Sequence, residues 1–424
     1  MAFLKNLLSG LEKKKVLPVQ KKFPIVCPHC FRKFEPEEVV FRATHSKEDD
    51  EEYALQEDEK LNAYLEKFRM EGIEELEAVI DPRTIPIEKS VYVDEVLISI
   101  KDKYDVETKK RLCPFCHNDL PYSAGRTPSN IIAIIGASQV GKSVYMTSLI
   151  HTLETSTAHN FNAACMPINS DTSRRFRDQY QDPLFVQNTL VESTQKEKKQ
   201  EPFIFQFKFK DTQKPPLSLV FFDVAGEGMV EEDYIDLYAN HIKNATGILF
   251  LVDPLQLSAI RSKIILNQGD KSGDFTSKYQ ESRDVVVTLA ENFIGLQEDG
   301  KTPIPTAIVV TKSDMLEYLA KDGDDYVKAN SNMFNNYVHK AYFNLDEHEN
   351  ISGEVQRFIE KVDLAFMDAI EVHFSNVSYF AVSALGQNPV EGKVEGVIEP
   401  TRVDEPFLWL LYKLRYIGAG ERVK

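Results

Sequence analysis

The chain has 424 residues, of which 42% are hydrophobic and 27% charged, a composition that excludes bulk disorder and supports a sizeable core. No window approaches 18 consecutive apolar residues, which excludes a membrane-spanning helix, and the N-terminus lacks the apolar core of a secretory signal. Five cysteines are too few for a disulfide scaffold of this length, so we expect a cytoplasmic protein.

The formal net charge of −16 is distributed unevenly. Residues 1–34 carry eight lysines and arginines against one acid, whereas residues 35–81 carry 17 acids against five bases. Residues 131–424 are acidic again, with 41 acids against 29 bases. Because phosphate contacts require a basic surface, we expect no nucleic-acid partner. A nucleotide pocket remains compatible with this charge, since the field of a phosphate loop is local.

Residues 1–22 form a basic segment in which five apolar side chains share one helical face beside several lysines. The apolar residues are Phe3, Leu4, Leu7, Leu8 and Leu11. Helices of this kind bind membrane surfaces, so membrane contact through residues 1–15 is one hypothesis. Docking on the protein itself or on a partner is the commoner fate of a short terminal helix.

Four of the five cysteines form two pairs, Cys27-Pro-His-Cys30 and Cys113-Pro-Phe-Cys116, each beside a predicted strand, at 23–26 and 110–112. Each pair places two thiolates on a tight turn, and two such turns make the tetrahedral four-sulfur site of a structural Zn²⁺. Two redox motifs are the weaker alternative, because a redox protein needs only one. We therefore predict a zinc ribbon at residues 23–125 with Cys27, Cys30, Cys113 and Cys116 as ligands.

The other residues near these motifs receive simpler interpretations. His29 and His117 adjoin the cysteines and are expected to support the site rather than to bind the metal. Cys165 stands alone in apolar sequence and is predicted to be a buried core residue.

The 82 residues between Cys30 and Cys113 exceed a normal ribbon loop, so an insertion is predicted at about residues 31–112. Two groups of apolar residues recur there at helical spacing and predict a helical hairpin, after which residues 91–100 predict one strand. The first group is Leu61, Tyr64, Leu65 and Phe68, and the second is Ile73, Leu76 and Ile80. The acidic run Glu48–Glu52 could dock a partner, although most charge runs are only solvated.

An apolar, β-branched run, Ile131–Ile135, leads into the pattern G-x-x-x-x-G-K-S and then into a predicted helix at 144–153. A strand and a helix on either side of this pattern are typical of a phosphate-binding loop. Its residues are Gly136, Ala137, Ser138, Gln139, Val140, Gly141, Lys142 and Ser143. The glycines let backbone N–H groups surround the phosphates, Lys142 would reach the β- and γ-phosphates, and the Ser143 hydroxyl would bind Mg²⁺.

Four further apolar strands are predicted, at 217–222, 247–253, 306–310 and 377–382. The first leads into Asp223-Val-Ala-Gly226, whose acid suits an outer-sphere Mg²⁺ contact and whose glycine N–H could reach the γ-phosphate. The third leads into Thr311-Lys312-Ser313-Asp314, and the fourth into Ser383-Ala384-Leu385. The carboxyl ends of strands are where a doubly wound sheet builds its ligand site.

In this order the motifs resemble the G-motif series of GTP-binding proteins of the TRAFAC/Ras-like class, over residues 131 to about 416. The resemblance implies an α/β P-loop sandwich with a mainly parallel sheet at residues 126–424, with insertions near 255–279, 315–350 and 386–403. It also implies guanine selection, in which Asp314 accepts from the base, Lys312 covers the ring, and Ser383-Ala384-Leu385 offers a backbone N–H. Because adenine presents the wrong polarity to a carboxylate, ATP would be penalised.

Combined with a zinc ribbon, the motifs resemble the bacterial double-GTPase (DO-GTPase) families, as does the closing segment Glu405-Pro-Phe-Leu-Trp409-Leu-Leu. In those families GTPase domains occur with zinc ribbons, often encoded beside other conflict-system components. The resemblance implies GTP or GDP, Mg²⁺ and Zn²⁺ as cofactors. It also implies a protein partner, either a second GTPase or another co-encoded component.

The sequence departs from the G-motif pattern at two positions. Thr311 stands where Asn is commoner, which would alter a contact that supports the phosphate loop. Glu227 follows Gly226 where many small GTPases place a water-orienting Gln, and a carboxylate there repels the γ-phosphate. We therefore expect slow hydrolysis, with Lys142, Gly226 and Glu227 as candidate catalytic residues.

The resulting hypothesis is a slow, Mg²⁺-dependent GTPase that acts as a molecular switch and controls a partner through its zinc ribbon. A pseudo-GTPase scaffold without significant hydrolysis and an ATPase using the same loop are the alternatives. Spacing does not select the threonine that would cap Mg²⁺, nor does it decide whether an arginine acts as a finger in cis. The threonine candidates are Thr172, Thr189 and Thr194, and the arginine candidates are Arg174, Arg175 and Arg177.

Overall fold

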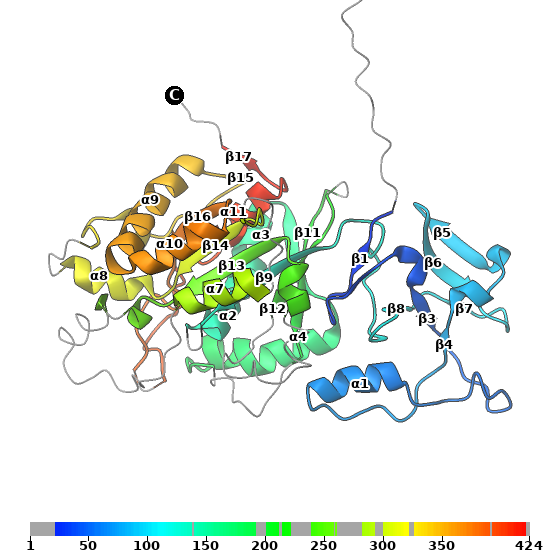
Figure 1. Ribbon diagram of the computed structural model, residues 1–424. Helices are drawn as coiled ribbons and strands as arrows, with labels where there is room; N and C mark the ends of the chain where they lie inside the picture. Colours follow the sequence, from blue (N-terminus) through cyan, green and yellow to red (C-terminus); the bar gives the residue numbers. More distant parts are fainter. Residues whose placement is uncertain are drawn as a thin grey trace, which may run out of the picture.

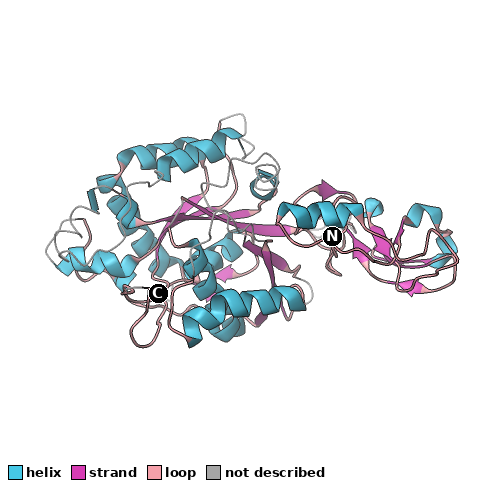
Figure 2. Ribbon diagram, turned by 90° about the horizontal axis from the view of Figure 1, so that it is seen from below, coloured by secondary structure: helices cyan, strands magenta, loops and turns pink. Residues whose placement is uncertain are grey.

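The computed structural model describes residues 22–137, 140–191, 201–211, 214–221, 239–257, 259–260, 282–292, 300–321, 326–390 and 392–420. In both views an N-terminal module, from β1 to β8, lies to one side of a larger body built on one central sheet (Figures 1 and 2). Residues 1–21 of the basic segment predicted at 1–22 lie outside the described residues. In the described part of the chain, no helix combines the length and apolarity needed to cross a membrane.

The larger body is built on a seven-stranded sheet of order β10-β11-β12-β9-β13-β14-β16. The five strands from β12 to β16 are parallel, and β10 and β11 are antiparallel to their neighbours. The strands are β9 (Asn130–Gly136), β10 (Ala163–Pro167), β11 (Phe203–Phe209), β12 (Leu217–Phe221), β13 (Gly247–Val252), β14 (Thr306–Val310) and β16 (Val377–Ala381). The predicted α/β fold with a mainly parallel sheet is confirmed.

Helices cover both faces of this sheet, as its sequence requires. Every residue of β13 and β14 is buried, and a strand buried on both faces is a continuous apolar run rather than an alternating one. Phe250 of β13 packs on Phe366 of α10, and Phe380 of β16 packs on Trp409 of α11 on the opposite face. The result is a three-layer sandwich (Figure 1).

The helices of this body connect the strands in chain order. They are α2 (Lys142–Thr152), α3 (Ala158–Asn160), α4 (Ser170–Phe176), α7 (Ser282–Asn292), α8 (Ser313–Lys321), α9 (Leu345–Val362), α10 (Leu364–His373) and α11 (Glu405–Lys413). Leu153–Thr157 and Arg177–Val186 continue α2 and α4 as π-helix. A small parallel pair, β15 (Tyr342–Phe343) and β17 (Gly418–Ala419), joins the second predicted insertion to the end of the described chain.

The N-terminal module consists of short antiparallel strands and one α-helix. The strands are β1 (Ile25–Val26), β2 (Lys33–Phe34), β3 (Val40–Arg42), β4 (Val79–Ile80), β5 (Ser90–Val93), β6 (Val96–Lys101), β7 (Glu107–Thr108) and β8 (Arg111–Leu112), and the helix is α1 (Glu59–Lys67). They pair as β1-β2, β4-β3-β8 and β5-β6-β7.

Two expectations for the insertion are wrong. The second helix of the hairpin does not form, because Leu76 bridges Gln56 and Ile80 of β4 pairs with Phe41 of β3. The expected single strand at 91–100 is instead a hairpin of β5 and β6. Asp94 and Glu95 turn the chain there with φ of 52° and 65°, the left-handed conformation that a two-residue hairpin turn requires.

A cluster of buried charges joins the second insertion to α11. The Arg402 side chain is 1% exposed, and its Nη1 donates to both carboxylate oxygens of Glu405 at 3.2 and 3.0 Å. The other guanidinium nitrogens donate to the Asn335 carbonyl and to Glu347, and His339 lies 3.3 Å from Glu405. These groups satisfy one another away from water, so each depends on the presence of the others.

We predict that Arg402→Met destabilises the larger body by about 3 kcal/mol, because it leaves the Glu405 carboxylate buried without its main partner. The free energy of unfolding in urea measures the change. Arg177→Met is the matched control, since Arg177 is 57% exposed and pairs with its neighbour Asp178. The control is expected to lose less than about 1 kcal/mol. Equal losses in the two variants would contradict the assignment.

Candidate functional site

The predicted phosphate loop lies between β9 and α2. A Cβ on Gly136 would lie 2.8 Å from the Leu251 carbonyl oxygen, so only glycine fits where the loop leaves the strand. Gly141, with φ of 85°, precedes the first residue of α2, Lys142. The Lys142 Nζ donates to the carbonyl oxygens of Gly136 and Ala137 at 3.1 and 3.0 Å. Ser143 lies in the first turn of α2, where backbone N–H groups favour anions.

Part of this loop lies outside the described residues, namely Ser138 and Gln139. Ala137 and Val140, on either side of that pair, are fully buried. Thr311 supports the loop from β14, because its hydroxyl lies 3.2 Å from the Val140 carbonyl and 3.3 Å from the Val252 carbonyl. A threonine at this position therefore still ties the base motif to the phosphate loop.

The predicted base motifs meet beside this loop. The Ser383 hydroxyl donates to Asp314 Oδ1 at 2.5 Å and accepts from the Gly386 N–H at 2.9 Å. The Ala384 carbonyl accepts from the Ser148 hydroxyl of α2 at 2.7 Å, and Leu385 is buried beside Leu184. Burial raises the pKa of Asp314, so a ligand that donates hydrogen bonds to its carboxylate would relieve an unfavourable environment.

Lys312 is held by Asp253, a residue that belongs to none of the sequence motifs. Its Nζ lies 2.5 Å from Asp253 Oδ2, and Asp253, at the end of β13, is 4% exposed at its side chain. The other oxygen of Asp253 accepts from the Leu255 N–H at 2.8 Å. Lys312 itself has a left-handed backbone, with φ of 52°. The sequence indicated a role for Asp253 only through its position after an apolar strand, a position that Asp223 shares.

Several expected site residues cannot be placed. Asp223, Gly226, Glu227 and Thr194 lie outside the described residues. The backbone N–H of Thr172 is bonded to Asn169 and the Thr189 hydroxyl to the Pro183 carbonyl. Each candidate finger arginine pairs with a carboxylate, Arg174 and Arg175 with Asp171 and Arg177 with Asp178. No described contact favours one of them as a finger.

The four paired cysteines meet at one point in the N-terminal module. Among the described residues, Cys27, Cys30, Cys113 and Cys116 are the group able to hold a metal ion, with all four sulfur atoms within 4.8 Å of one another. The Cys27–Cys116 and Cys30–Cys113 sulfur distances are 3.8 and 3.7 Å. Zinc–sulfur bonds of about 2.3 Å in a tetrahedron place the sulfurs about 3.8 Å apart, so the donor set fits Zn²⁺.

The two cysteine turns, which we call the first knuckle (Cys27–Phe31) and the second knuckle (Cys113–His117), have the same geometry. In each, an N–H points at the first sulfur at 3.4 Å, from His29 or Phe115. In each, the residue after the second cysteine is left-handed, with φ of 59° at Phe31 and 50° at His117. Burial raises the pKa of the Cys27 thiol, so a thiolate there needs a bound cation.

The histidines and the fifth cysteine lie as supporting or core groups. His117 Nδ1 is 2.8 Å from Asp58, which also accepts from Arg42 at 2.6 Å and caps α1. Burial alone would raise the pKa of Asp58, but the hydrogen bonds from His117 and Arg42 hold it well below its usual value. Cys165 is buried in β10, and burial raises the pKa of its thiol.

Comparison with known proteins places this geometry in a class. Residues 130–389 match the Double-GTPase 2 family (DO-GTPase2), which is more than half of the chain. The protein therefore belongs to the Double-GTPase 2 family of P-loop GTPases. This agrees with the family resemblance of the motifs and with the parallel sheet on which they lie.

One curated relative comes from Mycolicibacterium smegmatis and bears the name "Putative ESX-1 scaffolding and assembly protein SaeC". It is 26% identical over 316 residues, which cover 70% of this chain and 78% of that protein. Matching solved structures include the Arl6 BBS3 small GTPase of Trypanosoma brucei, with 12% identity, a TM-score of 0.25, and coverage of 69% of this chain and 100% of that one. Era of Aquifex aeolicus has 12% identity, a TM-score of 0.27, and coverage of 70% and 60%. No residue role is taken from structures this dissimilar.

We predict that Cys113→Ser abolishes the binding of one Zn²⁺ per chain and lowers the thermal stability of the N-terminal module, because a three-thiolate site no longer closes. Metal analysis of the purified protein measures the zinc content. Cys165→Ser is the matched control and is expected to keep full zinc content, since Cys165 lies in β10. Full zinc retention in Cys113→Ser would rule out the four-sulfur site.

Proposed function

We propose that this protein binds GTP with Mg²⁺, hydrolyses it slowly, and uses the two nucleotide states as a molecular switch in the cytoplasm. The observation that carries the proposal is the partly buried Asp314 carboxylate, which accepts from Ser383 beside a phosphate loop that Thr311 supports. The membership of the Double-GTPase 2 family agrees with it.

Guanine specificity follows from what Asp314 can accept. A carboxylate offers only acceptors, and guanine presents N–H donors on the edge where adenine presents an acceptor. Asp314 is partly desolvated, so facing adenine would leave it and the base edge unsatisfied. Asp253 would stay paired with the Lys312 ammonium and thereby hold the aliphatic part of the Lys312 side chain over the base.

The phosphate chemistry is assigned from the sequence motifs. Lys142 would exchange the carbonyls of Gly136 and Ala137 for phosphate oxygens, and Ser143 with Asp223 would hold Mg²⁺, which neutralises charge on the phosphates. Gly226 would donate its N–H to the γ-phosphate. Glu227 would orient water less favourably than Gln, because its carboxylate and the γ-phosphate are both negative and repel each other. Hydrolysis would therefore be slow.

The partner is proposed to be a protein, and the zinc-ribbon module the part that engages it. The relative named as a scaffolding and assembly protein supports a role in bringing components together. The proposed divisions are a basic segment at 1–22, the ribbon at 23–125 and the GTPase domain at 126–424. That same name also favours the pseudo-GTPase scaffold as a second candidate, in which nucleotide is bound without significant turnover.

We predict that the wild-type protein prefers GTP to ATP by at least about 100-fold in the presence of Mg²⁺, and that Asp314→Asn moves the preference towards xanthine nucleotide. An amide at this position donates where guanine also donates, whereas xanthine accepts. Titration with fluorescent nucleotides measures the affinities. Asp284→Asn, on an exposed part of α7, is the matched control and should leave them unchanged. Equal affinity for GTP and ATP would end the guanine assignment.

We predict phosphate release under multiple turnover on the order of 10⁻⁴ to 10⁻² s⁻¹, the range of GTPases without an activating partner. Lys142→Ala should abolish this release, because no side chain then reaches the β- and γ-phosphates. A phosphate-release assay with excess GTP makes the measurement. Tight GTP binding without release above the Lys142→Ala background would favour the scaffold.

A further inference from the structure

The first knuckle lies against the GTPase domain at two separate places. One contact is at Glu201, which directly follows residues 192–200, the stretch of sequence that contains Thr194, one of the candidates for the Mg²⁺-capping threonine. The other is at residues 239–244, which precede β13 and follow the Asp223–Gly226 motif in the chain. Each contact therefore adjoins a stretch of sequence that would sense the γ-phosphate.

At the first contact, the Glu201 carboxylate is shared by three elements, and its side chain is only 12% exposed. Its Oε1 accepts from the Tyr64 hydroxyl of α1 at 3.1 Å and lies 3.7 Å from His29 Nδ1 of the first knuckle. Its Oε2 accepts a hydrogen bond from the Arg175 guanidinium of α4 at 3.1 Å. Glu201 thus joins the zinc module to the start of β11.

At the second contact, the Phe31 ring is fully buried against His241, with ring centroids 4.5 Å apart. The Asn244 side chain donates to the Phe31 carbonyl at 3.0 Å. The chain then enters β13, and the Thr246 N–H donates at 2.8 Å to the Ile131 carbonyl of β9. Phe31 is thus linked by packed and hydrogen-bonded groups to the strand that carries the phosphate loop.

The position of Phe31 depends on the shape of the knuckle. Its left-handed φ of 59° is disfavoured for a residue with a Cβ and persists only where the surroundings enforce it. Its N–H bonds the Cys27 carbonyl at 2.9 Å, while both cysteines of the turn belong to the metal-binding group. Bound metal would therefore fix the residue that docks on the GTPase domain.

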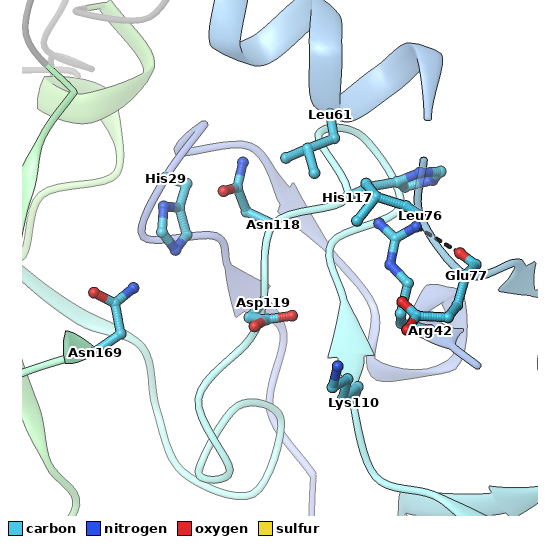
Figure 3. A pocket seen from close by; sticks show the side chains of 10 residues that line it. All are labelled: His29, Arg42, Leu61, Leu76, Glu77, Lys110, His117, Asn118, Asp119 and Asn169. Carbon is cyan, nitrogen blue, oxygen red and sulfur yellow. Dashed lines mark hydrogen bonds between the residues drawn. The ribbon is translucent and has the colours of Figure 1, made fainter. Parts of the chain in front are cut away.

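The space beside the first contact is not close-packed. An open pocket of about 230 Å³ lies on the module beside His29 and Asn118, and Asn169 lines it from the GTPase domain (Figure 3). Asn169 caps α4, the helix that carries Arg175. The pocket thus adjoins both His29 of the first knuckle and the N-terminus of α4.

We infer that the first knuckle couples the zinc centre to the nucleotide site, through Glu201 on one side and Phe31 on the other. The inference rests on the proposed GTP-binding function and adds its regulation. The second knuckle has another task, because its equivalent residue, His117, bonds Asp58 of the insertion. The ribbon thus connects the GTPase domain to the insertion through two matching turns. Coupling of this kind is reciprocal, so bound nucleotide would also change how tightly the four cysteines bind the metal.

The test compares the ratio of GTP to GDP affinity, measured with fluorescent analogues, in the zinc-loaded full chain and its variants. Phe31→Ala is expected to change this ratio by about fivefold or more. Tyr64→Phe removes only the hydroxyl bonded to Glu201, so it is expected to shift the ratio in the same direction by less, with folding unaffected. Phe115→Ala, in the second knuckle and 39% exposed, is the matched control and should leave the ratio unchanged. Metal analysis checks that every variant keeps its zinc.

The reciprocal measurement is the rate at which a colorimetric chelator removes zinc from the protein without nucleotide, with GDP and with a non-hydrolysable GTP analogue. We expect the GDP and GTP forms to differ by about fivefold or more in wild type and to converge in Phe31→Ala. The coupling alone would be overturned if the protein binds guanine nucleotide, but the ratio of GTP to GDP affinity is unchanged in Phe31→Ala and Tyr64→Phe and the rate of zinc release does not depend on nucleotide. Absence of guanine nucleotide binding in wild type would overturn the proposed function and the coupling together.

Discussion

The parallel register of β9, β13, β14 and β16 is the constraint on which the site depends. Gly136 pairs with Leu251, Val252 with Val310, and Val310 with Ala381, so these strands end at the same level. The residues that follow each strand then meet at one edge, where Thr311 bonds the Val140 carbonyl, Lys312 bonds Asp253, and Asp314 bonds Ser383. A shift of two residues in one strand would displace its contribution by about 6.6 Å and break these bonds.

The sequence predicted the GTPase sheet well because its strands are long, apolar and followed by compact motifs. The contacts between motifs could not be predicted, since they depend on strand order. Asp253 illustrates this limit: a single acid after an apolar run carries no motif, and only the pairing of β13 with β14 places it beside Lys312. Arg402 is similar, because two of its partners, Asn335 and Glu347, lie 67 and 55 residues away along the chain.

The N-terminal module was predicted less well, for a physical reason. The spacing of its four cysteines predicted their cluster directly. Several of its strands, however, are only two or three residues long, too short to show the alternation of apolar and polar residues that marks a strand. Ile73, Leu76 and Ile80 matched a helical spacing, yet pairing with neighbouring strands determined their structure. The turn at Asp94 and Glu95 lacks the glycine that usually follows Asn or Asp in a two-residue hairpin turn, so Asp94 alone gave only a weak signal for the β5–β6 hairpin.

The buried cluster around Arg402 also bears on how this protein can change over evolution. Deleting the segment that contains Asn335 and His339 would leave the Arg402 guanidinium and the Glu405 carboxylate partly unpaired in the interior. No single substitution would compensate for this deletion, because removing the charge of Arg402 or of Glu405 leaves the other charge buried without a partner. The segment beside the base motif can therefore be shortened without leaving a buried charge unpaired only if several positions change together.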